Sequence, residues 1–330
     1  MSRNASYGRS RGPAVFPEGD FFVVDVFKKS LPTPMRAMLS DDPRDILRFA
    51  VNAYREGRVA LAILVDIRGG AARALGSQVV VAADGRFSGY VSGGCVEAAV
   101  AAEALLAMET RSDRMVSFGD GSPFLDIVLP CGGGITVAIH VLRSVDIIEY
   151  VLQSLAQRKS AGLKYEPERQ ALTSIEPPER AGVKDGNVYL VYRPVTRVIA
   201  SGQKSETQSV QKIAVASGYE VLLCQQNEHT AELGQHIDAY TAFILLHHDL
   251  DQETKVLDIA LRSSAFYIGA LGSFNTHRRR IERLSEFGYT ACEIDRINAP
   301  IGIFGPARDS ATLGLSVLAD VAKKRSQRYP

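Results

Sequence analysis

Residues 88–97, SGYVSGGCVE, place two glycines directly before a cysteine, and a pattern typical of a helix follows at once. Glycine permits positive φ and lets backbone N–H groups approach a ligand. The first N–H groups of a helix have no partner inside it and carry partial positive charge, so anions bind there. The same position favours the thiolate of Cys95 over its thiol.

Two interpretations of this stretch stay open. In the first, Ser92, Gly93, Gly94 and Cys95 form a ligand-binding loop, with Cys95 as a nucleophile, a persulfide carrier or a ligand of a soft metal. Glu97 then belongs to the site or only favours the helix dipole. In the second, the glycines make a tight turn and Cys95 packs as a small hydrophobic residue.

A second cysteine with glycine neighbours favours the ligand site. In LPCGGGI (129–135), Cys131 precedes Gly132 and Gly133 at the start of a predicted strand. Cys95 and Cys131 suit a soft metal centre that accepts thiolate. The sequence has no CxxC motif and no histidine close to either cysteine, which excludes a structural zinc site. The other two cysteines are predicted to be buried and inert: Cys224 in an apolar strand and Cys292 in a helical run.

The periodicity around these loops predicts an α/β fold with two domains. Residues 1–30 form a flexible tail, and the first domain, 31–145, has helices at 42–57 and 94–108 and strands at 59–66, 78–83 and 135–142. Residues 146–194 read as a helix and a linker. From 195 to 330 strands alternate with helices, which predicts a Rossmann-like, doubly wound parallel sheet.

Composition excludes several classes of protein. The net charge of +1 argues against a nucleic-acid binder, and no apolar run reaches the length of about 18 residues that a transmembrane helix needs. The start of the chain lacks the apolar core of a secretory signal. Four cysteines in 330 residues are too few for a disulfide scaffold, so we expect free thiols in a reducing compartment, the cytoplasm.

The glycine loops also carry a resemblance. LGSQVVVAADGRFSGYVSGGCVEAAV and CGGGI, with the later YIGALGS and RINAPIG, resemble the XdhC/CoxI family of xanthine dehydrogenase accessory proteins. The resemblance implies a chaperone that binds molybdopterin, the molybdenum cofactor, as cargo and delivers it to the apo-form of a molybdenum hydroxylase. It also implies a cysteine desulfurase as sulfur donor. Cys95 and Cys131 would contact the metal–sulfur end, and the glycine loops would receive the phosphate.

The second domain departs from the family's nucleotide fingerprint. After the first strand Gly202 keeps the first glycine position, but Lys204 stands at the second and Thr207 at the third. The backbone has to approach the pyrophosphate at the second position, and a lysine side chain blocks that path. Gln225 and Gln226 replace the acidic residue that binds the ribose. These changes argue against NAD(P), although Lys204 offers a phosphate a point charge.

Other residues of the second domain fit a ligand edge. His248 and Asp249 follow an apolar strand, where doubly wound sheets bind ligands, and Gly269, Gly272 and Ser273 belong to the GALGS stretch. The basic run 276–280, THRRR, begins a helix and either holds an anion or forms a solvated face, which is the more common case.

Four functions remain under consideration from the sequence: a cofactor chaperone, which leads, a nicotinamide-dependent oxidoreductase, a sulfur-transfer protein with Cys95 as persulfide, and a protein that only contacts a partner. A homodimer is also expected, because dimers are common at this size.

Overall fold

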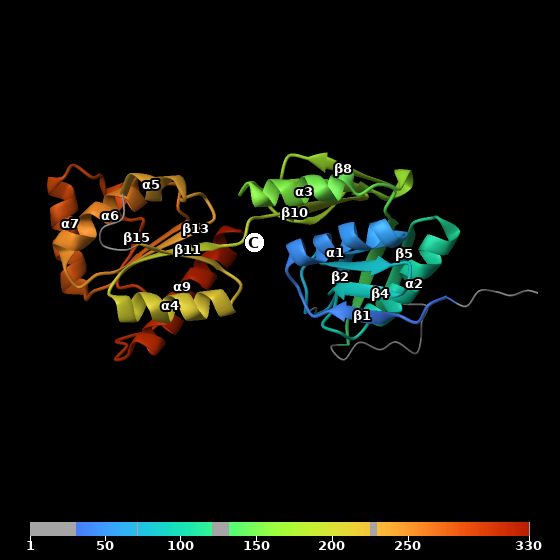
Figure 1. Cartoon of the computed structure of the whole chain (residues 1–330), viewed down its shortest axis with the longest axis horizontal. Coiled ribbons are helices and arrows are strands. Elements are labelled where there is room, and N and C mark those ends of the chain that lie inside the picture. The colour runs from blue at the N-terminus through green and yellow to red at the C-terminus, as the bar shows by residue number, and fades with distance from the viewer. Residues whose placement is uncertain (1–30, 71, 121–131, 225–229, 330) are drawn as a thin grey trace, which may run out of the picture. The chain divides into compact units, whose positions relative to one another are not determined.

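A mixed six-stranded sheet forms the centre of the first domain. The computed structural model describes residues 31–70, 72–120, 132–224 and 230–329, so the predicted N-terminal tail and Cys131 lie outside the described residues. The strand order is β1-β4-β3-β2-β6-β5. Figure 1 labels β1, β2, β4 and β5 of this sheet. Its strands are β1 (Met35–Met38), β2 (Val59–Arg68), β3 (Gln78–Ala82), β4 (Arg86–Gly89), β5 (Arg114–Gly119) and β6 (Gly134–Val141). Only the β1–β4 pair is parallel.

Each face of this sheet is covered by helix because β2 is apolar on both sides. Val59, Leu61 and Ile63 join the core under α1 (Pro43–Glu56). The alternate residues Ala60, Ala62 and Leu64 join the core under α2 (Glu97–Thr110). Side chains of a strand point to opposite faces in turn, and a continuous apolar run such as VALAILV therefore predicts burial on both.

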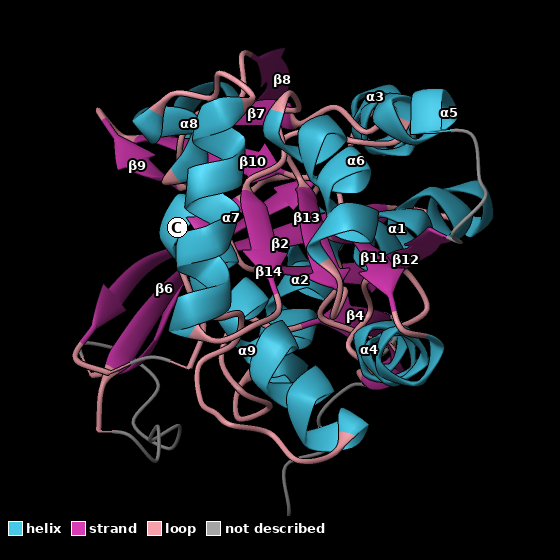
Figure 2. Ribbon diagram, turned by 90° about the vertical axis from the view of Figure 1, so that its left-hand side faces the viewer, coloured by secondary structure: helices cyan, strands magenta, loops and turns pink. Residues whose placement is uncertain are grey.

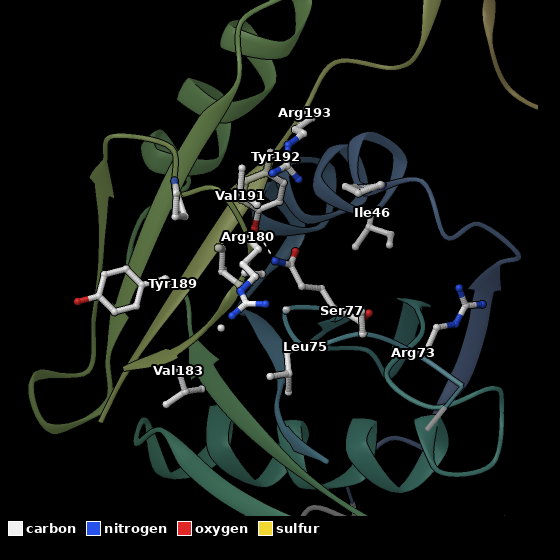
Figure 3. A pocket seen from close by; sticks show the side chains of 18 of the residues that line it. Ile46, Arg73, Leu75, Ser77, Arg180, Val183, Tyr189, Val191, Tyr192 and Arg193 are labelled. Carbon is white, nitrogen blue, oxygen red and sulfur yellow. Dashed lines mark hydrogen bonds between the residues drawn. The ribbon is translucent and has the colours of Figure 1, made fainter. Parts of the chain in front are cut away.

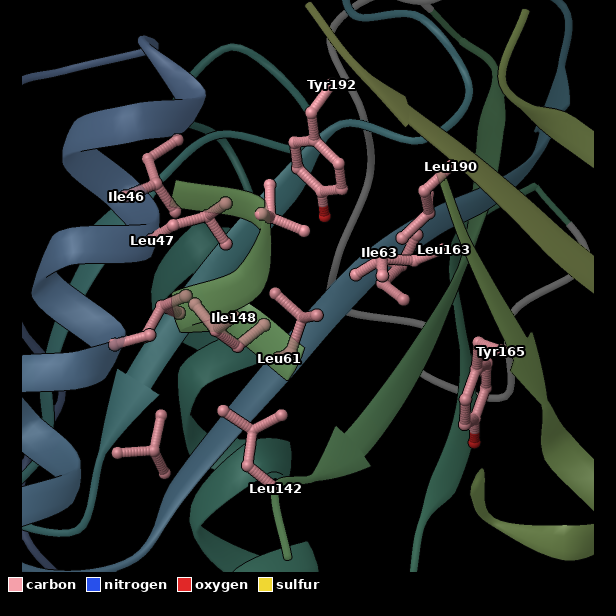
Figure 4. Close-up of a cluster of buried hydrophobic side chains, with 14 of the residues drawn as sticks. Ile46, Leu47, Leu61, Ile63, Leu142, Ile148, Leu163, Tyr165, Leu190 and Tyr192 are labelled. Atoms are coloured by element: carbon pink, nitrogen blue, oxygen red, sulfur yellow. The ribbon is translucent and has the colours of Figure 1, made fainter. Parts of the chain in front are cut away.

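A second, four-stranded antiparallel sheet completes the first core. Its order is β8-β7-β10-β9, and its strands are β7 (Ala161–Glu166), β8 (Ala171–Ile175), β9 (Gly182–Lys184) and β10 (Asn187–Tyr192). With α3 (Asp146–Ala156), it packs Leu163, Tyr165 and Leu190 into the cluster that holds Leu47 (Figure 4). The prediction of a helix at 146 is confirmed, but the prediction of a linker after it is wrong. The strands here are short, and the segments that connect them carry Pro and Glu, which hid their alternation.

The second domain contains the parallel sheet predicted from the sequence. Five strands have the order β12-β11-β13-β14-β15: β11 (Arg197–Gly202), β12 (Glu220–Cys224), β13 (Thr241–Leu246), β14 (Tyr267–Ala270) and β15 (Ile297–Asn298). The helices, cyan in Figure 2, are α4 (Lys204–Ala216), α5 (Thr230–Gln235), α6 (Leu250–Leu261), α7 (Phe274–Glu286), α8 (Ala291–Ile294) and α9 (Ser310–Arg328).

The two faces of this sheet are filled by different helices. Phe243 and Leu245 of β13 join the core with α6, while Ala242, Ile244 and Leu246 join the core with α4 and α9. The fold is thus doubly wound, as the sequence predicts. No helix in the described part of the chain is both long and apolar enough to cross a membrane.

Candidate functional site

The loop before α2 is fastened at its base by a buried carboxylate. Glu97, the first residue of α2, is completely buried. Its Oε1 accepts the Val91 N–H (3.1 Å) and the Ser92 N–H (2.8 Å), and the Ser92 hydroxyl donates to the carboxylate at 2.9 Å. Glu97 therefore fixes the start of the loop, at Val91 and Ser92.

The rest of the loop, at Gly94 and Cys95, is open to solvent. Gly94 has φ +110°, and a Cβ built on it would meet nothing within 4 Å, so the position demands glycine for its backbone and leaves free space around it. Cys95 is exposed. No side chain caps the N-terminus of α2 at Val96. The sequence prediction of an accessible thiol beside uncapped helix N–H groups fits this geometry.

The second predicted glycine segment lies next to the same stretch of chain. A Cβ on Gly133 would be 3.1 Å from the carbonyl oxygen of Gly70, and a Cβ on Gly93 would be 3.4 Å from Cβ of Ala72. The loop after β2 therefore touches both Gly93 and Gly133. Gly132 is exposed with φ +67°.

The sequence analysis missed this third loop. Gly69 and Gly70 directly follow the buried strand β2, which is itself a signal for a backbone that other loops approach closely. Arg68, at the end of β2, donates hydrogen bonds to the Asp120 carbonyl oxygen (3.0 Å) and to the Thr136 hydroxyl of the neighbouring strand β6 (2.9 Å).

Two arginines add positive charge beside the thiol loop. Tyr90, just before Val91, has the guanidinium of Arg36 at 4.3 Å and that of Arg73 at 4.9 Å from its ring centroid. Arg73 also pairs with Asp41 at 2.9 Å. Among the described residues no group of three or more His, Cys, Asp or Glu side chains is placed to hold a metal ion. The loop thus combines one exposed thiol, free N–H groups and nearby cations.

The glycine turn of the second domain is closed by packing. Gly202 has φ +139°, and a Cβ there would be 2.2 Å from the Leu246 carbonyl oxygen. The Gln203 N–H donates to that same oxygen at 3.0 Å. Lys204 is exposed as the first residue of α4, and Glu206 adds a carboxylate to the same first turn.

The predicted site at His248 contains two adjacent histidines that differ in burial. His248 is exposed, with its Nε2 3.1 Å from Oε1 of Glu206, and Asp249 caps α6 by accepting the Asp251 N–H at 2.8 Å. The neighbouring His247 is buried, and its Nε2 lies 2.9 Å from the Ser201 hydroxyl. Burial lowers the pKa of His247 below its usual value.

The remaining predicted residues of this edge have structural contacts. Any side chain on Gly269 would collide with Ile301, Gly272 has φ +133°, and Ser273 caps α7 by accepting the Thr276 N–H at 3.2 Å. A ligand-binding role for these residues, and the absence of NAD(P), stay predictions.

The basic run 276–280 is not wholly a solvated face, as the sequence suggested. Arg280 is buried and forms an ion pair with Glu253, whose Oε2 lies 2.9 Å from its Nη2.

Two predictions about cysteines are wrong. Cys292 in α8 is exposed, not buried, because this four-residue helix buries only Ile294. Cys224 is half-buried at the end of β12, an edge strand of its sheet. Cys292 nevertheless lacks the glycine loop that surrounds Cys95.

Comparison with known proteins agrees with these features. The model of the XdhC and CoxI family matches residues 53–119, and that of the XdhC Rossmann domain matches residues 198–321. A curated relative is 48% identical over 293 residues, covering 88% of this chain and 92% of its own: the molybdenum cofactor insertion chaperone PaoD of Escherichia coli K12. The chain belongs to the XdhC and CoxI family. The resemblance read from the loops is therefore confirmed.

A solved structure supports the fold of this XdhC and CoxI family member. A crystal structure described as a xanthine dehydrogenase from Bacillus halodurans matches with a TM-score of 0.66. The match covers 88% of this chain and 97% of that one. At 17% identity it speaks for the shared architecture alone.

Proposed function

We propose that this protein binds the molybdenum cofactor and helps to insert it into a molybdenum enzyme of the xanthine dehydrogenase type. Family membership and the 48% identity to a molybdenum cofactor insertion chaperone support the proposal. The observation that carries it is the exposed Cys95 on an open glycine loop whose base is fixed by Glu97. A rigid base with an accessible thiol suits a protein that holds a reactive cargo and then releases it.

The roles of the loop residues follow from their chemistry. The Cys95 thiolate is a soft donor that would contact the metal–sulfur end of the cargo. The backbone at Gly93, Gly94 and the start of α2 would receive the negative charge of that metal–sulfur end. Gly133 adjoins the same third loop. Cys131, which lies outside the described residues, would serve as a second donor.

The partners are part of the proposal. The cargo has to pass to an apo-enzyme, and a cysteine desulfurase would supply the sulfur of the metal centre. The exposed Cys95 has to remain a free thiol, which requires a reducing compartment such as the cytoplasm. The second domain would serve as a scaffold or bind a different ligand, and two copies would pair as a homodimer.

The test is the pterin content of protein purified from a host that makes molybdopterin. Oxidation converts the bound cofactor to a fluorescent pterin that can be quantified per chain. We expect close to one pterin per wild-type chain, little in Cys95→Ser, and the wild-type amount in Cys292→Ser, because Cys292 is also exposed but lies outside the glycine loops. Wild-type protein without pterin, or equal pterin in both variants, would contradict the proposal.

The same exposed thiol supports a second candidate, a sulfur relay. In that reaction the Cys95 thiolate attacks the outer sulfur of a donor persulfide, a new S–S bond forms, and the donor leaves as a thiolate. Incubation with a loaded desulfurase followed by intact-mass measurement distinguishes the two functions. One added sulfur atom on Cys95 but no bound pterin would favour the relay.

A further inference from the structure

A large pocket lies beside the loop that carries Cys95 and is lined in part by Arg73 and Tyr90, which adjoin that loop. It has a volume of about 1050 Å³ and is formed by the start of α1, the segment 73–78, Tyr90, and residues 178–193 around the β9–β10 hairpin (Figure 3). Apolar side chains such as Ile46, Leu75 and Val183 form much of its wall. A cavity of this size with apolar walls accepts a planar ring.

The charged side chains of the pocket are mostly cationic. Arg73, Arg180, Lys184 and Arg193 line it, against the single carboxylate of Asp41, which already pairs with Arg73. The side chains of Arg180 and Lys184 are exposed and make no hydrogen bond or ion pair with any described residue. Figure 3 shows the Arg180 guanidinium between Tyr192 and Val183. Unpaired cations at an apolar cavity favour an anionic ligand, and arginine suits a phosphate in particular.

A buried amide in the pocket has one end without a partner. Gln78 is 7% exposed, and its Nε2 lies 2.5 Å from the hydroxyl of Tyr192. Its Oε1 is buried and has no hydrogen-bond partner among the described residues. Whichever way the amide is turned, Tyr192 contacts only one end. This oxygen lacks a partner but is closed to solvent, so a ligand with a hydrogen-bonding edge reaches it once the Gln78 side chain turns toward the pocket.

We infer that this pocket binds a phosphorylated pterin, with the ring against Gln78 and the phosphate against Arg180. The inference rests on the proposed function, since it makes the pocket the place of the organic part of the cargo. Two residues of the pocket lie next to the loop that carries Cys95. Arg73 follows Ala72, which adjoins Gly93, and Tyr90 directly precedes Val91 at the base of the loop. A ligand with its pterin in the pocket would direct its metal–sulfur end to Cys95.

The probe for this site is neopterin monophosphate, whose ring fluoresces, titrated into pterin-free protein and followed by fluorescence anisotropy. We expect saturable binding, weakened about tenfold by Arg180→Ala and about tenfold by Gln78→Leu, since each removes one polar contact. Arg169→Ala should bind as the wild type does, because Arg169 is an exposed arginine of the same domain that does not line the pocket.

Matched ligands separate the two contacts. With unphosphorylated neopterin, Gln78→Leu should still weaken binding, while Arg180→Ala should have no effect. Guanosine monophosphate also carries a phosphate and a ring with an amino-pyrimidinone edge, but it is a nucleotide. Tighter binding of this nucleotide than of neopterin monophosphate would overturn the pterin assignment. No saturable binding to the wild type, or unchanged binding in both variants, would overturn the pocket itself.

The pterin content of the purified variants separates this inference from the proposed function. If Arg180→Ala and Gln78→Leu purify with as much pterin as the wild type while Cys95→Ser does not, the pocket is wrong and the chaperone stands. If no form carries pterin and neopterin monophosphate still binds, the proposed function fails and the pocket remains as a site for phosphorylated heterocycles.

Discussion

Each domain has a glycine turn that leads from a strand towards a helix, and the two turns use their glycines differently. At the first, Gly94 has positive φ with open space around it, and an exposed cysteine follows. At the second, Gly202 also has positive φ, but the backbone of Leu246 fills the space where a side chain would be. The first turn leaves its backbone accessible to a ligand, and the second packs strands together.

This difference shows that a glycine in a strand-to-helix turn does not by itself indicate a ligand. The surroundings decide, because positive φ serves close packing as well as it serves ligand access. Both helices carry a carboxylate in their first turn. Glu97 of α2 is buried and accepts N–H groups of its own loop, whereas Glu206 of α4 contacts the exposed His248. The ligand site of this protein is therefore expected in the first domain.

The largest effect is expected from Gly202→Ala. The new Cβ would collide with the Leu246 carbonyl group and force an alanine into a strained φ, so we expect a loss of about 4 kcal/mol in the free energy of unfolding. Urea-induced unfolding measures it. Gly218→Ala is the matched control, since Gly218 also has positive φ (+78°) but open space, and should lose about 1 kcal/mol. Equal losses would show that packing does not close the second turn.

Glu97→Ala should come next. The substitution leaves the Val91 N–H, the Ser92 N–H and the Ser92 hydroxyl without their acceptor, so we expect a loss of about 3 kcal/mol on unfolding and a lower pterin content. Glu109→Ala, an exposed position of the same helix, should change stability by less than about 0.5 kcal/mol. A Glu97 variant as stable as the Glu109 variant would remove the idea of a fixed base.

Gly94→Ala tests the turn of the first domain, where the glycine has open space around it. With nothing within 4 Å of the added Cβ, only the strained φ counts, and the expected loss is about 1 kcal/mol. The same urea titration applies. A loss as large as that of Gly202→Ala would mean that the first turn is packed as tightly as the second.

A smaller effect should appear in the pH dependence of the second turn. Because burial lowers the folded-state pKa of His247, the unfolded chain takes up a proton more readily than the folded chain does. Stability is therefore fully present above about pH 6.5 and falls as the pH drops below that value. His247→Gln should reduce the loss between about pH 7.5 and pH 5.5. An equally steep loss in the variant would contradict a dry, closed edge.

Much of this fold was predicted from the sequence because its longer strands and helices show clear apolar runs or helical spacing of apolar residues. The strand β2 and the helix α1 were recognisable from their patterns alone, and so was the alternation of strands and helices in the second domain. The sheet β7–β10 was missed since its strands alternate only weakly and are broken by turns that carry Pro and Gly. Burial of Arg280 was missed for a different reason: its partner Glu253 lies in another helix, and no local pattern reveals that pair.

The candidate site was predicted unevenly for the same physical reason. Cys95 and its glycines are adjacent in sequence, and their types alone indicate an open loop. Gly70 and Ala72 enter the site only through contacts with Gly93 and Gly133, which are distant along the chain. The amide of Gln78 in the pocket likewise depends on Tyr192. Contacts between distant segments are set by the packed fold, so the residues that complete this site had to come from the structure.

The most direct test of the central claim is alkylation of the cysteines by iodoacetamide, read by peptide mass spectrometry, in pterin-loaded and pterin-free protein. Cys95 and Cys292 are both exposed, so both should react in the pterin-free protein. The account predicts that bound cofactor protects Cys95 and leaves the labelling of Cys292 unchanged. Labelling of Cys95 at the same rate with and without bound pterin would contradict the claim that the first glycine loop brings this thiol to the cofactor.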